Sequence, residues 1–176
     1  SVVRCFIENK MDNLPEQPTK FYYITPVFRY ERPQSGRFRE HTQFGIEVFG
    51  SNSTLIDAEV ISIAYNFYSL LGLKNLKVKI NTLGDIESRI KYKEALIEYF
   101  TPHKDILCED CQKRLIKNPL RILDCKIDCD KEIMKNAPKI SDYLNEDSKN
   151  RFKEVLDILT YLEIDYEIDN NLVRGL

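Results

Sequence analysis

Long apolar runs and an excess of positive charge are both missing from this sequence. No run approaches the ~20 apolar residues that a membrane-spanning helix needs, and the opening residues do not follow the pattern of a secretory leader. The formal net charge is −2, which argues against a generally basic surface for nucleic acid. We therefore expect no membrane contact, and any contact with RNA must use local patches such as Arg32, Arg37 and Arg39.

Histidine is scarce as well, since the chain has only His41 and His103. Neither has a recognisable Ser or Cys nucleophile with an orienting acid beside it, so we assign them no catalytic role of the triad type. What the chain does contain is enough apolar side chain for one modest core, because 43% of its 176 residues are hydrophobic and 31% are charged. This composition predicts an ordinary soluble piece with one core and a small satellite domain.

Residues 28–50 predict two strands joined by a basic loop. Side chains alternate between the two faces of a strand, so one face of this hairpin is polar and carries Arg29, Glu31, Gln43, Gly45 and Glu47. The other face is apolar, and we expect it to be core: Phe28, Tyr30, Phe44, Ile46 and Val48. Charge on a strand face is costly to bury unless a ligand or a counter-charge meets it. The alternative is a solvent-exposed polar face on a half-buried antiparallel sheet.

Strands and helices alternate irregularly around this hairpin. Residues 2–10 predict a helix, 11–20 a loop and 21–25 a strand that leads into the hairpin. Thr54 is the expected N-cap of a helix that Gly72 ends. The expected buried stripe of that helix is Leu55, Ala58, Ile61, Ala64, Tyr68 and Leu71.

A mostly helical section follows, over residues 86–165. Two helices are predicted there, each given by its N-cap and its last residue: Asp85 to about Phe100, and Asn145 to about Leu162. Residues 77–81, 166–168 and 172–174 are expected to be strands of the sheet. Because there is no strict strand-helix-strand repeat, we predict an α+β fold with a largely antiparallel sheet, flanking helices and a separable helical section.

Residues 28–50 also resemble the second signature motif of class II aminoacyl-tRNA synthetases, in the form used by the histidyl-tRNA synthetase family. The match runs through Phe-Arg-x-Glu, then Glu-Arg-Pro-Gln-x-Gly-Arg-x-Arg, then Gln-Phe-Gly-x-Glu. Residues 171–176, Asn-Leu-Val-Arg-Gly-Leu, are similar to the start of the family's histidine-specific motif. Residues 118–124, Asn-Pro-Leu-Arg-Ile-Leu-Asp, are similar to its insertion region. The three matches follow the family's order over nearly the whole chain.

The resemblance implies a class II synthetase fold, an antiparallel sheet flanked by helices with an inserted helical domain. Residues 1–85 and 166–176 would form part of the catalytic domain, and residues 86–165 the insertion domain that approaches the acceptor arm of tRNA. The family's first and third motifs and its anticodon domain have no match here. We therefore expect a piece of a longer protein that is inactive by itself.

Members of this family are ATP-dependent ligases of protein biosynthesis. The resemblance implies that the complete protein is a cytoplasmic homodimer that binds ATP with Mg²⁺, activates L-histidine to histidyl-adenylate and transfers it to tRNA(His). Activation brings two anions together, because the carboxylate of histidine attacks the α-phosphorus of ATP, so the site needs fixed positive charge. Arginine suits this task because its planar group binds carboxylate or phosphate oxygens in two places at once.

The resemblance also implies which residues bind ATP. Arg29 would contact the α-phosphate, and Arg174 would stabilise charge on it from the other side of the reacting centre. These two are the expected catalytic residues. Glu31 would lie by the adenine, and Arg37 would reach the terminal phosphates.

The histidine site is expected on the polar strand face. In the family, the residues matching Gln43 and Glu47 contact the amino acid, with Arg29 and Arg174 close to it. Four residues at ~3.3 Å each separate Gln43 from Glu47 by about 13 Å, so the ligand must lie between them. Small Gly45 would leave room for it. The alternative is a purely structural pair of polar strand residues.

Four cysteines form a constellation that these motifs do not explain. Cys108 and Cys111 form a Cys-x-x-Cys pair, and Cys125 and Cys129 form a Cys-x-x-x-Cys pair. Four thiolates in two close pairs suit tetrahedral Zn²⁺, whereas disulfides do not fit a cytosolic protein. The alternative is four reduced thiols, partly buried in a helical lobe.

Two other functions fit parts of this pattern. One is the non-catalytic paralogue that serves as the regulatory subunit of ATP phosphoribosyltransferase, which shares the fold without charging tRNA. The loop arginines, the pair of Gln43 and Glu47, and the Asn-Pro-Leu-Arg segment favour the synthetase. The other is a zinc-dependent nucleic-acid-binding module, which depends on the cysteines alone and has little basic surface behind it.

Overall fold

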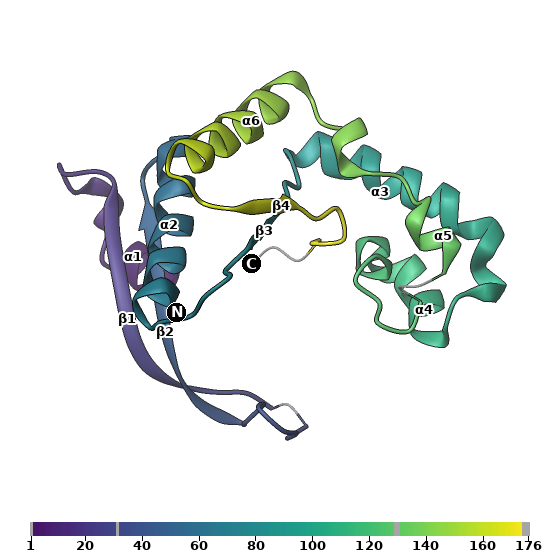
Figure 1. The fold of residues 1–176 in the computed structure, drawn as a ribbon, viewed down its shortest axis with the longest axis horizontal. Helices are drawn as coiled ribbons and strands as arrows, with labels where there is room; N and C mark the ends of the chain where they lie inside the picture. Colours follow the sequence, from purple (N-terminus) through teal and green to yellow (C-terminus); the bar gives the residue numbers. More distant parts are fainter. Residues whose placement is uncertain (1, 31, 129–130, 174–176) are drawn as a thin grey trace. The chain divides into compact units, whose positions relative to one another are not determined.

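The computed structural model describes residues 2–30, 32–128 and 131–173. Figure 1 shows a long two-stranded hairpin, several helices and a second, short pair of strands. In chain order the elements are α1 (Val2–Glu8), η1 (Met11–Asn13), β1 (Thr19–Phe28), β2 (Glu40–Phe49), α2 (Thr54–Leu70), β3 (Val78–Ile80), α3 (Ile86–Phe100), η2 (Thr101–Ile106), α4 (Glu109–Lys117), η3 (Pro119–Ile122), α5 (Glu132–Lys135), η4 (Ile140–Asp142), α6 (Glu146–Tyr161) and β4 (Tyr166–Ile168). Among the described residues, no helix combines the length and the apolarity that crossing a membrane requires.

The chain divides into two compact units, Ser1–Val60 and Ile61–Leu176. The first unit holds α1, the long hairpin and the first turns of α2, and the second holds the other helices and the short strand pair. The division into a partial catalytic domain and an insertion domain over residues 86–165 stays a prediction.

The strands β1 and β2 form an antiparallel hairpin, but β1 ends at Phe28, where the first strand of the predicted hairpin was expected to begin. Their register places Thr19 opposite Phe49 and continues without interruption to the last residue of β1. One further backbone bond, from Arg29 N to Arg39 O at 2.7 Å, extends the pairing beyond the strand ends. β1 instead joins the strand predicted over residues 21–25 to Phe28 and starts at residue 19, within the loop predicted over residues 11–20.

A tight turn closes the loop between the two strands. Gln34 and Arg37 exchange two backbone hydrogen bonds of 3.2 and 2.9 Å. Between them Gly36 has φ of +72°, in the left-handed region that glycine adopts without steric cost. The turn leaves Arg37 exposed.

The expectation that the apolar face of the hairpin is core is wrong for most of its residues. Phe28 is 72% exposed and Tyr30 99% exposed, and Phe44 is exposed as well. Helix α1 packs on the other face of the hairpin, where its Phe6 ring stacks on the Phe49 ring with centroids 4.5 Å apart. The face that was predicted to carry the polar residues therefore also has an aromatic contact, at Phe49.

Helix α2 also differs from its prediction at its start and along its stripe. Thr54 is its first helical residue rather than its cap, and the hydroxyl of the preceding Ser53 accepts the Leu55 N–H at 3.3 Å. Ala58 is fully buried, but Leu55 and three other members of the expected stripe are exposed: Ala64, Tyr68 and Leu71. Only the first turns of the helix belong to the unit that contains the hairpin, so hairpin packing buries a short part of the stripe.

The C-terminal end of α2 follows the prediction. Gly72 has φ of +82°, and its N–H donates to Ser69 O at 2.9 Å. The N–H of Leu73 donates to Tyr68 O at 3.2 Å. These two bonds are those of a Schellman motif, which satisfies the last carbonyl groups of a helix.

The main core of the protein lies in the helical part of the second unit. Its fully buried side chains include Tyr92, Leu96 and Phe100, which recur at four-residue spacing along one face of α3. They pack with side chains from α4, η3 and the segments that follow, including Cys111, Leu115, Ile122, Cys125, Met134 and Ile140. Two of the four predicted zinc ligands are therefore part of this core.

The N-caps of α3 and α6 are those predicted from the sequence. The Asp85 carboxylate accepts the Ser88 N–H at 2.9 Å, and the Asn145 side chain accepts the Ser148 N–H at 2.8 Å. The two caps also contact each other, because Asn145 Nδ2 donates to Asp85 Oδ2 at 2.9 Å. This contact joins the starts of two helices that are far apart in the chain.

A second pair of strands, β3 and β4, is parallel (Figure 1). The two strands are separated by the helical section, which provides the long connection that a parallel pair needs. Both strands were predicted, and in the described part of the chain they pair with each other as a separate two-stranded sheet. Residues 172–173 form no strand; Leu172 N instead donates to Asp169 O at 3.0 Å in a turn. Arg174 lies outside the described residues.

Candidate functional site

Three side chains form a hydrogen-bonded series on the polar face of the hairpin. Nε2 of Gln43, on β2, donates to the Tyr23 hydroxyl on β1 at 2.9 Å. Oε1 of Gln43 accepts from Arg29 Nη2 at 3.3 Å. Both ends of the amide are therefore occupied, which restrains the Gln43 side chain. Arg29 follows the last residue of β1 and is exposed, so this predicted site residue lies at the surface of its unit.

Gly45 permits this arrangement because it lies directly opposite Tyr23 in the strand register. A Cβ atom at position 45 would overlap the Tyr23 ring at Cζ, Oη and Cε1. Only a residue without a side chain lets the ring lie across the strand and reach Gln43. Gly45 was predicted to leave room for a ligand, but the Tyr23 ring occupies the space next to Gly45.

Glu47 lies on the same strand face as Gln43, with Gly45 between them, and is half-buried. It is paired with Phe21 in the register. Phe21 lies in edge contact with Phe49, at 6.0 Å between ring centroids. The predicted histidine-binding residues are thus bounded by aromatic rings on one side and by Arg29 on the other.

The loop between the strands carries the predicted basic patch. Arg32, Arg37 and Arg39 are all exposed, and the Arg39 guanidinium carbon lies 5.5 Å from the centroid of the Tyr30 ring. This is the distance range of a cation–π contact. Glu31, the predicted adenine contact, lies outside the described residues.

Three of the four predicted zinc ligands come together in the second unit. Cys108 immediately precedes α4, Cys111 lies in the first turn of that helix, and Cys125 follows η3. The sulfur atoms of Cys108 and Cys125 are 3.8 Å apart. Asp128 is the fourth member, and one ligand atom from each of these four residues lies within 4.8 Å of the others. Cys129 lies outside the described residues.

Asp128 is fully buried in this cluster. Its Oδ2 accepts the Cys108 N–H at 3.0 Å, and Lys131 Nζ lies 2.7 Å from its Oδ1. Burial by itself would raise the pKa of Asp128, but the bonds from Lys131 and Cys108 hold that pKa well below its usual range. Burial raises the pKa of the Cys111 thiol.

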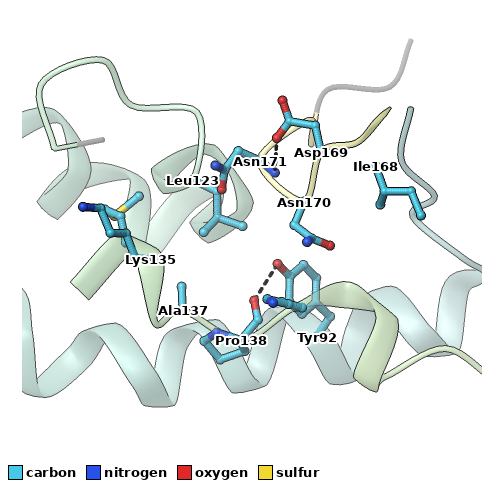
Figure 2. A pocket seen from close by; sticks show the side chains of 11 residues that line it. Tyr92, Leu123, Lys135, Ala137, Pro138, Ile168, Asp169, Asn170 and Asn171 are labelled. Carbon is cyan, nitrogen blue, oxygen red and sulfur yellow. Dashed lines mark hydrogen bonds between the residues drawn. The ribbon is translucent and has the colours of Figure 1, made fainter. Parts of the chain in front are cut away.

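A separate pocket of about 240 Å³ lies next to the C-terminal turn. Figure 2 shows Tyr92 and Pro138 on one side of it, joined by a hydrogen bond from the Tyr92 hydroxyl to the Pro138 carbonyl at 3.0 Å. The turn of residues 169–171 lies on the other side, and there Asn171 N donates to Asp169 Oδ1 at 3.0 Å. None of the predicted site residues in the described part of the chain lines this pocket.

Tyr23 and Asp128 are the two site residues that the sequence analysis missed. Tyr23 lies opposite Gly45 in the strand register, and alternation within one strand does not give that register. Asp128 follows Cys125 at the spacing that separates Cys108 from Cys111. The predicted ligand set contained the neighbouring Cys129 in place of this carboxylate.

Comparisons with known proteins agree on one family. A family model described as histidyl-tRNA synthetase matches residues 1–96. Over its whole length the chain is 57% identical to the histidine–tRNA ligase of Anoxybacillus flavithermus and 60% identical to that of Bacillus licheniformis, and it covers 42% of each. It thus spans about two fifths of the length of these relatives.

The crystal structure of apo S. aureus histidyl-tRNA synthetase matches as well. The match covers 99% of this chain and 40% of that one, with a TM-score of 0.75 and 43% sequence identity. This confirms the predicted α+β fold of the class II synthetase type.

Proposed function

The chain belongs to the histidyl-tRNA synthetase family, and we therefore propose that it is part of a ligase that joins L-histidine to tRNA(His). In the first step the histidine carboxylate attacks the α-phosphorus of ATP, which binds with Mg²⁺. A bond from carboxylate oxygen to phosphorus forms, the bond from the α-phosphorus to the bridging oxygen breaks, and pyrophosphate leaves. In the second step a terminal ribose hydroxyl of tRNA(His) attacks the carbonyl carbon of histidyl-adenylate, and AMP leaves.

The observation that carries this proposal is the series formed by Arg29, Gln43 and Tyr23. One Nη2–H of Arg29 donates to Gln43, and a guanidinium group has five N–H donors in a fixed plane. The bond to Gln43 orients that plane, while the remaining donors contact the α-phosphate. Orienting the charge before the reaction lowers the cost of stabilising the transition state.

Arg37, Glu31 and Arg174 complete the proposed ATP site. Arg37 is at the tip of the loop and exposed, which suits contact with terminal phosphates that extend beyond the strands. Glu31 contacts the adenine. Arg174 is proposed, from the family resemblance, to stabilise negative charge on the α-phosphate together with Arg29.

The proposed histidine site lies between Gln43 and Glu47. The half-buried Glu47 carboxylate accepts a hydrogen bond from the ammonium group or from an imidazole N–H. The Tyr23 hydroxyl, which already accepts a hydrogen bond from Gln43, is a further polar contact at the same face. Because the Tyr23 ring lies across Gly45, histidine either contacts the ring or displaces it.

The remaining parts of the proposal concern the complete protein. Residues 86–165 form the insertion domain that approaches the acceptor arm of tRNA, next to a partial catalytic domain of residues 1–85 and 166–176. The complete enzyme is a cytoplasmic homodimer. The family relationship supports these statements.

Amino-acid-dependent exchange between ATP and pyrophosphate tests the proposal on the full-length protein. Histidine is compared with the other amino acids, and Arg174→Ala is the control variant. We expect exchange with histidine alone and its loss in the variant. Exchange with no amino acid would contradict the ligase function and favour the regulatory paralogue of ATP phosphoribosyltransferase.

A further inference from the structure

We propose that Cys108, Cys111, Cys125 and Asp128 bind one Zn²⁺ ion in a closed structural site. The ligand set is three thiolates and one carboxylate, and Asp128 takes the place that the sequence analysis gave to Cys129. None of these four residues belongs to the proposed histidine and ATP site. The zinc site can therefore be tested whether or not the ligase function is correct.

The distances within the cluster match tetrahedral coordination. A Zn–S bond is about 2.3 Å long, so two sulfur ligands of a tetrahedral ion lie about 3.8 Å apart. The observed distance between Cys108 Sγ and Cys125 Sγ is 3.8 Å. A sulfur and a carboxylate oxygen at about 2.3 and 2.1 Å from the ion would lie about 3.6 Å apart, and Cys125 Sγ lies 3.9 Å from Asp128 Oδ2. These two distances are close to those expected around a tetrahedral ion, and all four ligand atoms lie within 4.8 Å of one another.

The fold brings two ligand pairs together from separate segments. Cys108 and Cys111 are presented by the start of α4, and Cys125 and Asp128 by the turns that follow η3. Each pair is separated by two residues, a spacing typical of structural zinc sites. The backbone bond from Cys125 N to Ile122 O, at 3.0 Å, holds the second pair to the end of η3.

Burial and charge also favour a bound cation. Cys111 and Asp128 are fully buried and Cys125 is 5% exposed, so all three are withdrawn from water. A buried carboxylate is costly unless charge and hydrogen bonds compensate it. Three thiolates and one carboxylate carry four negative charges. Zn²⁺ and the Lys131 ammonium together bring the net charge of the cluster to −1. When the zinc ion binds, the three thiol groups release their protons to solvent.

An outer contact supports the proposed carboxylate ligand. The Cys108 N–H donates to Asp128 Oδ2 at 3.0 Å, and Lys131 lies at the other oxygen. Hydrogen bonds of this kind orient carboxylate ligands in metal sites. With four protein ligands the ion has no open position, so it stabilises the packing of α4 against the turns after η3 and takes no part in hydrolysis or transfer.

Zinc content and metal affinity test this proposal. The full-length protein is purified without chelator, and its zinc is measured by mass spectrometry beside the variants Cys111→Ser, Asp128→Asn and Cys129→Ser. We expect Cys111→Ser to contain about one zinc ion per chain less than the parent protein. Competition with a chelator should show affinity that is about tenfold or more weaker in Asp128→Asn and unchanged in Cys129→Ser.

A cobalt titration keeps the test independent of the folding of the Cys111 variant. Co²⁺ added to the metal-stripped parent protein should give intense visible bands and a thiolate charge-transfer band, and Zn²⁺ should remove both. The parent protein lacking both zinc and these bands would overturn the site. Loss of zinc from Cys129→Ser with full retention in Asp128→Asn would overturn the carboxylate ligand.

Discussion

The side-chain amide of Gln43 donates a hydrogen bond to the Tyr23 hydroxyl on the facing strand, at 2.9 Å. The same amide accepts from Arg29, so one residue of β2 joins two residues of the other strand segment. This arrangement depends on Gly45, because any side chain there would overlap the Tyr23 ring. Two hydrogen bonds therefore hold the side chains of this polar face in one arrangement.

Gly45→Ala should weaken histidine binding in the full-length protein. The added methyl group displaces the Tyr23 ring and separates its hydroxyl from Gln43, which disturbs the proposed pocket. We expect the KM for histidine in pyrophosphate exchange to rise by about tenfold, which corresponds to ~1.4 kcal/mol. Thr42→Ala is the matched control, since it shortens a side chain on the opposite face of the same strand. Equal KM values in the two variants would show that Gly45 does not shape the site.

Glu47→Gln removes a negative charge from the proposed histidine pocket with little change in shape. Hydrogen bonds to charged groups contribute about 1.5–3 kcal/mol, so we expect the KM for histidine to rise by about 10- to 100-fold. Glu40→Gln is the control, because Glu40 also belongs to β2 but shares its face with Phe28. An unchanged KM in Glu47→Gln would remove Glu47 from the pocket.

Local sequence signals predicted the N-caps of α3 and α6, the end of α2 and the strand β2, but not which faces are buried. Asp85 and Asn145 cap their helices as expected because a cap depends only on the next three residues. Burial depends on which other element covers a face. Phe6 of α1 packs on one face of the hairpin, whereas Phe28 on the opposite face is exposed, and no periodicity in β1 or β2 contains that information.

The candidate sites show the same division. Alternation correctly placed Gln43, Gly45 and Glu47 on one face, because side-chain direction follows directly from strand geometry. It did not indicate that Tyr23 would occupy the space at Gly45, since that requires the pairing of two strands. The role of Asp128 was equally hidden, because its proximity to Cys108 depends on how the chain turns after η3.

Tyr92→Phe should destabilise the helical unit. The Tyr92 ring is fully buried, and its hydroxyl donates to the Pro138 carbonyl at 3.0 Å. Removing the hydroxyl leaves a carbonyl without this donor, so we expect the free energy of unfolding to fall by about 1–3 kcal/mol. Urea denaturation followed by circular dichroism measures it. Tyr161→Phe, at a side chain that is 86% exposed, should change the value by less than about 0.5 kcal/mol, and an equal loss in both variants would contradict the assignment.

Asp85 should make the stability of the helical unit depend on pH in the acid range. Its side-chain and backbone hydrogen bonds with Ser88 hold the pKa of Asp85 below the ordinary value of 3.8. A carboxyl group with a lowered pKa in the folded state binds fewer protons there than in the unfolded chain. Its contribution is therefore fully present above pH 3.8 and is lost as the pH falls through the lower, folded pKa.

Asp85→Asn isolates this effect because asparagine still caps a helix but does not titrate. We expect the urea midpoint of the parent chain to fall more steeply than that of the variant as the pH falls below 3.8, since only the parent takes up a proton at this position. The bond from Asn145 Nδ2 to Asp85 Oδ2 transmits this protonation to the start of α6 as well as α3. Parallel curves for parent and variant would show that the capping carboxylate contributes nothing to acid sensitivity.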